Sequence, residues 1–376
     1  MSETPTPRVR PRVAVVFGGR SSEHGISCVT AGSVLAAIDP EEYDVVPIGI
    51  AHDGRWVLEA GEPERLAIGA GGALPQVDAA RPVVRLDQDG GALTVQPPGE
   101  VPRALGEVDV VLPLLHGPFG EDGTLQGLLE LADVAYVGAG VLASAVSMDK
   151  HYMKVVLRSA GLPVLPHVLV TPRGWEQDRE ACRESVRALG YPVFVKPCRG
   201  GSSMGISKVR DESGLDAAIE TAREHDPRVL VESFSGPGAR EIECGVLETE
   251  DGRGVSTSVA AEILVGGEHE FYDFAAKYLP EEATDLHVPA DLEEDTEAEI
   301  RQYAAEAFLA LGIEGLARVD FFVQDGGRVV INEVNTMPGF TPTSMFPRMW
   351  AASGVEYPTL VRRLLTRALA RGTGLR

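Results

Sequence analysis

The stretch LARVDFFVQDGGRVVINEVNTMPGF (residues 316–340) predicts two apolar strands joined by a tight turn. If Gly326 and Gly327 form a two-residue loop, Asp320 lies directly opposite Glu333. The β-carbons of directly opposed residues are about 5 Å apart, so two carboxylates repel each other there unless positive charge lies between them. The hairpin therefore predicts a site that binds a cation.

The same register places Arg318 opposite Asn335, on the face that carries the two carboxylates. Asp320, Glu333 and Asn335 then supply hard oxygen ligands, the set that suits Mg²⁺ together with substrate phosphates. The alternative is a sheet face of mixed charge, in which Arg318 neutralises its neighbours. The metal–nucleotide interpretation is favoured because the strands are otherwise apolar, and a polar cluster in that setting is costly without partners.

Size and composition are those of a soluble globular protein. The chain has 376 residues, of which 44% are hydrophobic and 24% charged, so two or three domains are expected. No apolar run reaches the length of a membrane span. Residues 1–12 form a polar tail without the apolar core of a secretory signal, and we expect this tail to be disordered. Four cysteines without metal-ligand spacing indicate reduced thiols in a cytoplasmic protein: Cys28, Cys182, Cys198 and Cys244.

The net charge of −22 argues against nucleic acid or an anionic membrane as a partner. It would also repel an anionic nucleotide, so the positive charge of a nucleotide site has to be local. Only five of the 34 basic residues are lysines, and a compact ammonium group suits a phosphate oxygen as a point charge. The lysines are therefore candidate phosphate ligands: Lys150, Lys154, Lys196, Lys208 and Lys277.

The order of predicted elements indicates an α/β protein in three parts. Strands alternate with helices over residues 1–139, which favours a Rossmann-like parallel sheet with a Gly- and Pro-rich peripheral insertion of short hairpins and loops at 53–103. A central part covers residues 140–233, and a C-terminal part with the hairpin covers 234–376. Aromatic residues in the polar loop 266–286 favour a lid over a site, with a plain surface loop as the alternative.

The central part contains a candidate phosphate loop. We expect it to begin with one helix across residues 142–160 and to contain another across 175–189. A strand then ends at Lys196 and leads into the Gly- and Ser-rich loop 197–205, whose backbone N–H groups and hydroxyls suit a flap over phosphates. An ordinary Gly-Ser loop is the alternative, and the pattern of a P-loop enzyme does not occur.

Four further polar residues lie at or near strand ends. Glu23 is in the loop after the first strand, where open α/β sheets bind ligands, and can accept an ammonium group. His116 starts a loop that opens a helix, where free N–H groups favour an anion. Glu232 and Glu241 flank another loop and suit an adenine amino group and ribose hydroxyls. Taken singly, His116 is more often a structural histidine, and Glu232 and Glu241 are more often solvated glutamates. The loop with Glu23 lacks G-x-G-x-x-G, which disfavours a nicotinamide cofactor.

Taken together, six motifs resemble those of the D-alanine–D-alanine ligases of the ATP-grasp superfamily. They are GGRSSEH (18–24), HGPFGEDGTLQG (116–127), SMDK (147–150), VKPCRGGSSMG (195–205), FYDFAAKY (271–278) and ARVD…NEVNTMPGFTPTS (317–344). The resemblance runs from Arg12 to the C-terminus and implies three α/β domains, with ATP gripped between the second and third. It also implies the ATP-dependent joining of two D-alanines through an acyl phosphate, for peptidoglycan precursor synthesis. Mg²⁺ is the implied metal, as two ions that Mn²⁺ can replace, and the implied assembly is a homodimer.

The resemblance assigns roles to individual residues. The implied metal ligands are Asp320, Glu333 and Asn335. The implied nucleotide ligands are Lys150, Lys196, Ser203, Lys277 and, at the adenine and ribose, Glu232 and Glu241. At the amino-acid end, Glu23 orients the ammonium of the first D-alanine, with Ser202 and Tyr278 as a hydrogen-bonded latch of the lid. The remaining substrate residues are His116, Ser344 at the carboxylate of the second D-alanine, and an oxyanion site of Arg318 and the Gly339 backbone.

Two positions depart from the family pattern, and two other functions remain open. Gly25 and Gly200 stand where acidic residues are usual, which predicts altered local hydrogen bonding rather than lost chemistry. A D-alanine–D-lactate ligase would have a similar C-terminal segment, although Tyr278 in its AAKY context resembles the dipeptide-forming enzymes. A non-catalytic ATP-grasp module that binds nucleotide as a regulator would lack a ligand or the oxyanion residue, and none is lacking.

Overall fold

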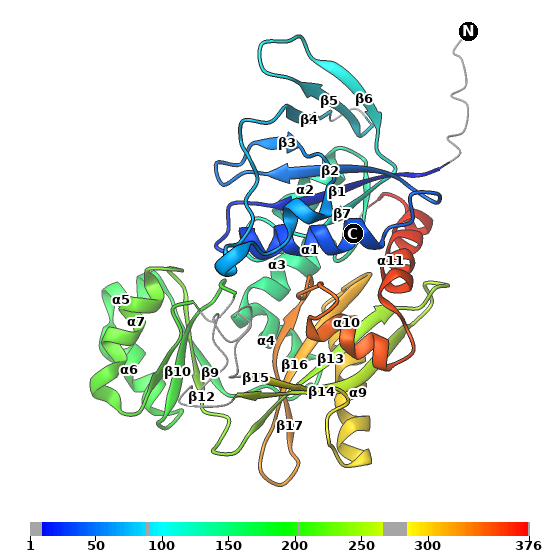
Figure 1. Ribbon diagram of the computed structural model, residues 1–376. Helices are drawn as coiled ribbons and strands as arrows, with labels where there is room; N and C mark the ends of the chain where they lie inside the picture. Colours follow the sequence, from blue (N-terminus) through cyan, green and yellow to red (C-terminus); the bar gives the residue numbers. More distant parts are fainter. Residues whose placement is uncertain (1–9, 88–89, 202–203, 266–283, 375–376) are drawn as a thin grey trace.

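The computed structural model describes residues 10–87, 90–201, 204–265 and 284–374, which form three sheets with helices packed against them (Figure 1). The strands of the three sheets fall within residues 12–136, 167–233 and 240–335. The predicted mixed α/β class is confirmed, and the domain boundaries after residues 139 and 233 stay a prediction.

The first sheet has eight strands in the order β6-β5-β4-β3-β2-β1-β7-β8. The strands from β2 to β8 in this order are parallel, as predicted, and the strands from β3 to β6 continue the sheet in antiparallel pairs. The predicted short hairpins at 53–103 therefore extend the sheet instead of standing apart from it. The strands are β1 (Arg12–Gly18), β2 (Asp44–Ile50), β3 (Trp56–Leu58), β4 (Val83–Leu86), β5 (Ala92–Gln96), β6 (Arg103–Glu107), β7 (Val110–Pro113) and β8 (Ala135–Tyr136).

Strand β1 is buried on both faces, as expected for a strand inside a parallel sheet. Val13, Val15 and Phe17 pack with helix α1 (His24–Ala37) and with the C-terminal helix α11 (Tyr357–Arg371). Ala14 and Val16 pack toward helix α2 (Thr124–Leu131) on the opposite face. The carboxyl ends of β1 and β7 consequently lie side by side, and both lead into loops that carry candidate site residues.

The second sheet is antiparallel, with the order β11-β10-β12-β9. Its strands are β9 (His167–Val170), β10 (Val193–Pro197), β11 (Ser207–Val209) and β12 (Val229–Ser233). Val193, Val195, Val229 and Val231 form a core with helices on one face of the sheet. The alternate positions Phe194, Lys196 and Glu232 line a cavity on the other face. The covering helices are α5 (Pro172–Gln177), α6 (Arg179–Arg187) and α7 (Leu215–Arg223).

Both helices predicted for the central part are interrupted by an aspartate. The segment 142–160 forms α3 (Val141–Met148) and α4 (Lys150–Ser159), and the segment 175–189 belongs to α5 and α6. Asp149 accepts hydrogen bonds from two backbone N–H groups of α4, and Asp178 accepts one from α6. The prediction of single helices was wrong because aspartate at these positions stabilises a new helix start.

The third sheet is antiparallel, with the order β15-β14-β13-β16-β17. One face packs on α3, α4 and α9, and the face that bears Arg318 and Asp320 turns to the cavity. Residues 266–283 of the predicted lid lie outside the described residues, and 284–286 belong to a strand. The elements of this region are β13 (Arg240–Glu248), β14 (Val255–Val265), β15 (Thr284–His287), α9 (Glu294–Ala310), β16 (Leu316–Val323), β17 (Val329–Asn335) and α10 (Met345–Ala352).

The β16–β17 hairpin has the predicted register at the site but a different turn. Asp320 pairs with Glu333, and Arg318 with Asn335, which confirms both predicted pairs. The loop has three residues, 325–327, because the Gln324 N–H donates to the Arg328 carbonyl at 2.9 Å, so the two-residue loop was wrong. A bulge in β17 restores the register, since Phe321 pairs with Ile331 and leaves Asn332 as the extra residue.

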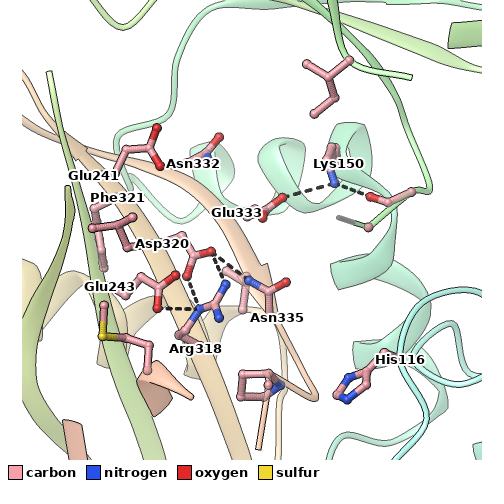
Figure 2. A pocket seen from close by; sticks show the side chains of 18 of the residues that line it. His116, Lys150, Glu241, Glu243, Arg318, Asp320, Phe321, Asn332, Glu333 and Asn335 are labelled. Atoms are coloured by element: carbon pink, nitrogen blue, oxygen red, sulfur yellow. Dashed lines mark hydrogen bonds and ion pairs between the residues drawn. The ribbon is translucent and has the colours of Figure 1, made fainter. Parts of the chain in front are cut away.

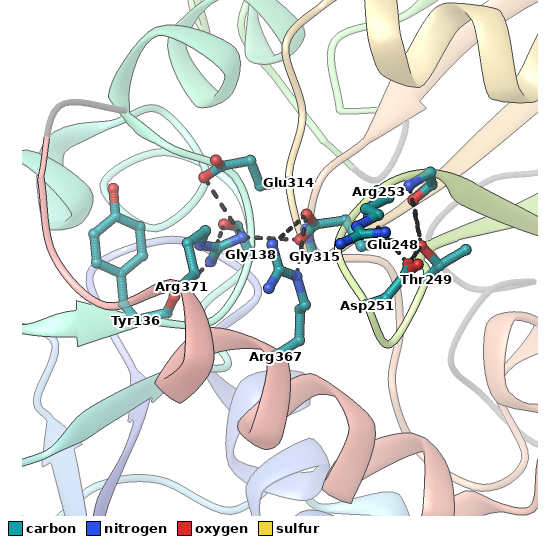
Figure 3. Close-up of polar contacts among 11 residues, drawn as sticks. Tyr136, Gly138, Glu248, Thr249, Asp251, Arg253, Glu314, Gly315, Arg367 and Arg371 are labelled. Carbon is teal, nitrogen blue, oxygen red and sulfur yellow. Dashed lines mark hydrogen bonds and ion pairs between the residues drawn. The ribbon is translucent and has the colours of Figure 1, made fainter.

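A cluster of ion pairs joins the first and third sheets (Figure 3). Arg371 of α11 donates to the Tyr136 carbonyl of β8 at 3.0 Å and pairs with Glu248 of β13 at 2.9 Å. Glu248 also accepts the Gly315 N–H at 2.7 Å. Helix α11 therefore joins the first sheet to the third. None of the described helices is long and apolar enough to cross a membrane.

Candidate functional site

A cavity of about 690 Å³ is lined by residues of the second and third sheets, by helix α1, and by the loops that follow β1 and β7 of the first sheet. Figure 2 shows part of its lining. The cavity brings together most of the residues that the sequence singled out. These are Glu23, His116, Lys150, Lys196, Glu232, Glu241, Arg318, Asp320, Glu333, Asn335, Gly339 and Ser344. Four predicted residues, Ser202, Ser203, Lys277 and Tyr278, lie outside the described residues.

The hairpin face carries two carboxylates whose charge is balanced by basic side chains. Asp320 accepts two hydrogen bonds from Arg318, both at 2.7 Å, and one from the Asn335 amide at 3.0 Å. Glu333 pairs with Lys150 at 3.2 Å. Within the described residues, no group of three His, Cys, Asp or Glu side chains could hold a metal ion. Two opposed carboxylates and an amide oxygen nevertheless fit a hard divalent cation whose remaining ligands are water and phosphate.

Arg318 lies between Asp320 and Glu243, whose carboxylate is 3.2 Å from the Arg318 Nε. Burial alone would lower the pKa of Arg318, but the two carboxylates outweigh it and raise the pKa well above its ordinary value. The sequence analysis missed Glu243, which faces Asp320 from β13 and is almost fully buried. Its spacing of two from Glu241 was the available signal, because alternate residues of a strand share a face.

Two lysines line the opposite wall of the cavity. The Lys150 ammonium donates to the Gly200 carbonyl in the candidate flap at 2.9 Å, in addition to its pair with Glu333. Burial opposes the charge of Lys150, but Glu333 outweighs it and raises the Lys150 pKa. Lys196 pairs with Glu232 at 2.8 Å and lies 3.4 Å from the Asn332 side chain. Both ammonium groups are thus fixed at the cavity by carboxylates.

The carboxylate of Glu232 is occupied by two lysines. Its other oxygen is 2.6 Å from the ammonium of Lys154, and both side chains are 1% exposed. Burial would raise the pKa of Glu232, but the two lysines lower it to about 2. Contact with a nucleotide base at this position would therefore fall to the backbone beside Glu232 and not to its carboxylate. Lys154 was one of the five candidate phosphate ligands, but it is buried behind Glu232 and is not among the residues that line the cavity.

Aromatic side chains that the sequence analysis did not assign line the cavity beside these lysines. The rings of Phe194 and Phe234 have their centroids 6.0 Å apart. The ammonium of Lys208 lies 4.8 Å from the Phe234 ring centroid, and all three residues line the cavity. Such a wall suits a planar base, because stacking on a ring face requires no matching hydrogen bond.

The end of the cavity near the first sheet is built around Glu23. A β-carbon placed on Gly117 or on Gly201 would lie 2.7 Å or 2.9 Å from a Glu23 carboxylate oxygen, so a side chain at either position would displace that carboxylate. Gly117 also has a φ of +72°, which favours glycine. His116 donates from Nδ1 to the Met337 carbonyl at 3.0 Å, and its buried Nε2 has no protein partner among the described residues. Burial lowers the pKa of His116, which favours the neutral ring.

Glu121 connects the loop after β7 to the third sheet. Its carboxyl group accepts the Gly117 N–H at 2.8 Å and the Met337 N–H at 2.9 Å. Burial raises the pKa of Glu121 to about 8, with the nearby Glu23 acting in the same direction. The residue was quoted within its motif but given no role by sequence reasoning. Its contacts indicate that it fixes the loop that carries His116 against the segment after β17.

Ser344 is the last residue of the segment between β17 and α10, and its side chain bonds within that segment. Its hydroxyl accepts the Thr341 N–H at 3.2 Å and lies 2.8 Å from the Thr341 hydroxyl. A β-carbon on Gly339 would lie 3.2 Å from the same hydroxyl oxygen. Gly339 and Ser344 therefore lie together at the cavity wall, at the end that also holds Glu23 and His116.

Comparisons with known proteins agree with this arrangement. A family model described as the D-ala D-ala ligase N-terminus matches residues 12–139, and one described as the D-ala D-ala ligase C-terminus matches residues 156–366. A D-alanine–D-alanine ligase of Pseudarthrobacter chlorophenolicus is 58% identical and covers 100% of this chain and 98% of its own. The ligase of Streptomyces griseus subsp. griseus is 59% identical, with coverage of 100% and 97%.

Solved structures share the fold. The VanG D-Ala:D-Ser ligase of Enterococcus faecalis has a TM-score of 0.81 and 34% identity, and the match covers 96% of this chain and 99% of that one. The D-alanine–D-alanine ligase of Coxiella burnetii has a TM-score of 0.77 and 34% identity, with coverage of 96% and 94%. The fold is that of the ATP-grasp enzymes, and the chain belongs to the D-alanine–D-alanine ligase family.

Proposed function

We propose that the protein joins two D-alanine molecules into D-alanyl-D-alanine and converts one ATP to ADP and phosphate. The observation that carries this proposal is a single cavity with a different chemistry at each end. Lys150 and Lys196 supply positive charge at one end, and Glu23 supplies a carboxylate for an ammonium group at the other. Arg318 lies on the hairpin face between them. Family membership supports the same reaction, and we extend the proposal to a cytoplasmic homodimer.

At the nucleotide end, Lys150 and Lys196 would bind the phosphates, and Glu241 the ribose. We assign Lys277 and Ser203 to the phosphates as well, from their motifs. At Glu232, the backbone and not the carboxylate would bind the adenine. A divalent metal ion, Mg²⁺ or Mn²⁺, as one or two ions, would be held by Asp320, Glu333 and Asn335. When bound, it would spread the charge that develops on the transferred phosphoryl group.

At the amino-acid end, Glu23 would accept the ammonium of the first D-alanine, with Ser202 and Tyr278 closing over it. His116 lines the cavity, and its Nε2, which has no hydrogen-bond partner among the described residues, would contact this substrate. Ser344 would bind the carboxylate of the second D-alanine. The two D-alanines would then meet beside Arg318 and Gly339.

The reaction would proceed in two steps. A carboxylate oxygen of the first D-alanine attacks the γ-phosphorus of ATP, which gives an acyl phosphate and ADP. The amine of the second D-alanine then attacks the acyl carbon, phosphate leaves, and the amine loses a proton. Asp320 accepts from the Arg318 Nε–H and from one N–H of Nη2, and the remaining N–H groups of Arg318 would donate to the tetrahedral oxyanion, together with the Gly339 N–H.

ADP release tests the proposal and separates it from its alternatives. We expect ADP release with D-alanine alone, and a product with the mass of the dipeptide. D-lactate and D-serine are each tested as a second substrate together with D-alanine, between pH 7 and 9. D-lactate tests the D-alanine–D-lactate ligase alternative, and D-serine is included because the similar Enterococcus faecalis structure is that of a D-Ala:D-Ser ligase. Preferential formation of a mixed product would replace the dipeptide proposal. Nucleotide binding without D-alanine-dependent ADP release would favour a regulatory module.

A further inference from the structure

One face of helix α4 contacts three consecutive residues of strand β17. Lys150, Met153 and Lys154 are spaced three and four residues apart, so they lie on the same side of the helix. Lys150 pairs with Glu333, the Met153 sulfur accepts the Val334 N–H at 3.2 Å, and Lys154 donates to the Asn332 carbonyl at 2.7 Å. The bulge in β17 makes the last contact available, because the extra residue has no pairing partner on β16.

Lys154 belongs to a buried cluster of three charges. Its ammonium lies 2.6 Å from one oxygen of Glu232, and the other oxygen of Glu232 accepts a hydrogen bond from Lys196 at 2.8 Å. Lys154 and Glu232 are each 1% exposed, whereas the side chain of Lys196 is 10% exposed. Lys196 is therefore the member of the cluster that presents its charge to the cavity.

The charges of this cluster do not cancel. The pKa of Glu232 is lowered to about 2, so Glu232 is a carboxylate at neutral pH, and it faces two ammonium groups. Burial lowers the pKa of Lys154, and the Glu232 carboxylate acts against this shift. With both lysines protonated, the three side chains carry a net charge of one positive unit. Without Lys154, Lys196 and Glu232 would form a neutral pair, and an anion in the cavity would be attracted by Lys196 and repelled almost equally by Glu232.

We propose that Lys154 is a positioning residue for nucleotide binding. Its charge offsets that of Glu232, so the cluster keeps a net positive charge, which Lys196 directs at the nucleotide phosphates. The proposal deepens the proposed function and rests on it, since ATP is the anion that the cavity is expected to bind. Lys154 itself reaches no substrate: it is enclosed by α4, β12 and β17 and acts through Lys196.

Charge-matched variants test the electrostatic role. Lys154→Met removes the charge and keeps a chain of similar length, and we expect the Kd of ADP and the KM of ATP to rise about tenfold or more, with the KM of D-alanine within twofold. Lys154→Arg keeps the charge and should retain most of the affinity. In Lys154→Met/Glu232→Gln both charges are removed and the net charge of the cluster is restored, so we expect this variant to bind ADP at least about threefold more tightly than Lys154→Met.

The controls separate this proposal from a purely structural role and from the proposed function. Arg158→Met removes an exposed positive charge from the same helix and should leave ADP affinity within twofold, since exposed charges are screened. If folded Lys154→Met binds ADP within twofold of the parent, the proposal is wrong. If Lys154→Met does not fold, the double variant is compared with Glu232→Gln alone, and equal ADP affinity in these two variants would overturn the proposal. ADP binding by the parent without ligation would refute the proposed function alone.

Discussion

At the scale of single residues, Arg318 is held by Asp320 and Glu243 and lines the cavity. We expect Arg318→Ala to lower kcat at least ~10²-fold, because removal of one oxyanion donor typically costs that much. Steady-state ADP release measures it. The KM of ATP should change far less than kcat, since the lost interaction belongs to the transition state.

Arg318→Ala also leaves two carboxylates without their cation, which costs several kcal/mol when the groups are buried. Arg318→Lys is the matched control, because it keeps the charge but cannot form the paired hydrogen bonds to Asp320. Thermal unfolding of both variants shows whether they are folded at the assay temperature. A folded Arg318→Ala enzyme with kcat within a few-fold of the parent would remove Arg318 from the oxyanion site.

At the scale of single elements, Asp149 sets the start of helix α4 and thereby the position of Lys150. Its carboxylate accepts the N–H groups of His151 and Tyr152, both at 3.1 Å, and pairs with Arg228. We expect Asp149→Ala to lower the free energy of unfolding by about 1–3 kcal/mol, from the lost cap and the unpaired Arg228. The KM of ATP should rise as well, because the frayed helix start no longer fixes the Lys150 ammonium.

Asp178→Ala is the matched control for this prediction. Asp178 caps α6 through the Ala181 N–H at 3.0 Å, on the outer side of the second sheet, and it does not line the cavity. Its loss should cost about 1 kcal/mol of stability and leave the KM of ATP unchanged. Urea denaturation and ADP-release kinetics measure both variants. An equal KM of ATP in Asp149→Ala and the parent would contradict the link between the cap and Lys150.

The hairpin shows how far sequence reasoning reaches at this scale. The pairs of Asp320 with Glu333 and of Arg318 with Asn335 were predictable, because strand periodicity and the Gly-Gly turn fix the register to within one residue. The loop has one residue more than predicted, and the bulge at Asn332 compensates for it. Sequence did not reveal the bulge, because the contacts that stabilise it come from Lys154 and Lys196 on other elements.

The same reason explains what else was missed. Glu243 acts on Arg318 from a neighbouring strand, and the pairing of β13 with β16 is not encoded in any local pattern. The four short strands β3 to β6, between residues 56 and 107, extend the first sheet because alternate residues such as Leu93 and Val95 are buried, a signal that the Gly- and Pro-rich turns obscured. Local motifs thus identified most of the residues around the cavity, whereas tertiary partners determined which of them are held by ion pairs.

At the scale of the whole molecule, the cavity exists only while the three sheets keep their mutual positions, since strands of the second and third sheets and loops that follow strands of the first sheet line it. Glu23 lies in the loop after β1 of the first sheet, and Arg318 lies on β16 of the third. The contacts of the Arg371 side chain with Tyr136 and Glu248 join these two sheets far from the cavity (Figure 3). We call these contacts of Arg371 the joint. Loss of the joint is expected to change the position of Glu23 relative to Arg318.

Arg371→Ala tests that expectation. Its side chain is 11% exposed, and its loss leaves Glu248 with a weaker contact to Arg367 at 3.4 Å, so we expect the free energy of unfolding to fall by about 1–3 kcal/mol. Arg363→Ala is the control on the same helix, because its pair with Glu250 is exposed and should be worth less than about 0.5 kcal/mol.

Urea denaturation, followed by tryptophan fluorescence and by circular dichroism, measures the stability of both variants. If the joint couples the sheets, the two probes should coincide in the parent and separate in Arg371→Ala, as expected when cooperative unfolding is lost. Coincident transitions and equal stability in both variants would show that the sheets are held together elsewhere.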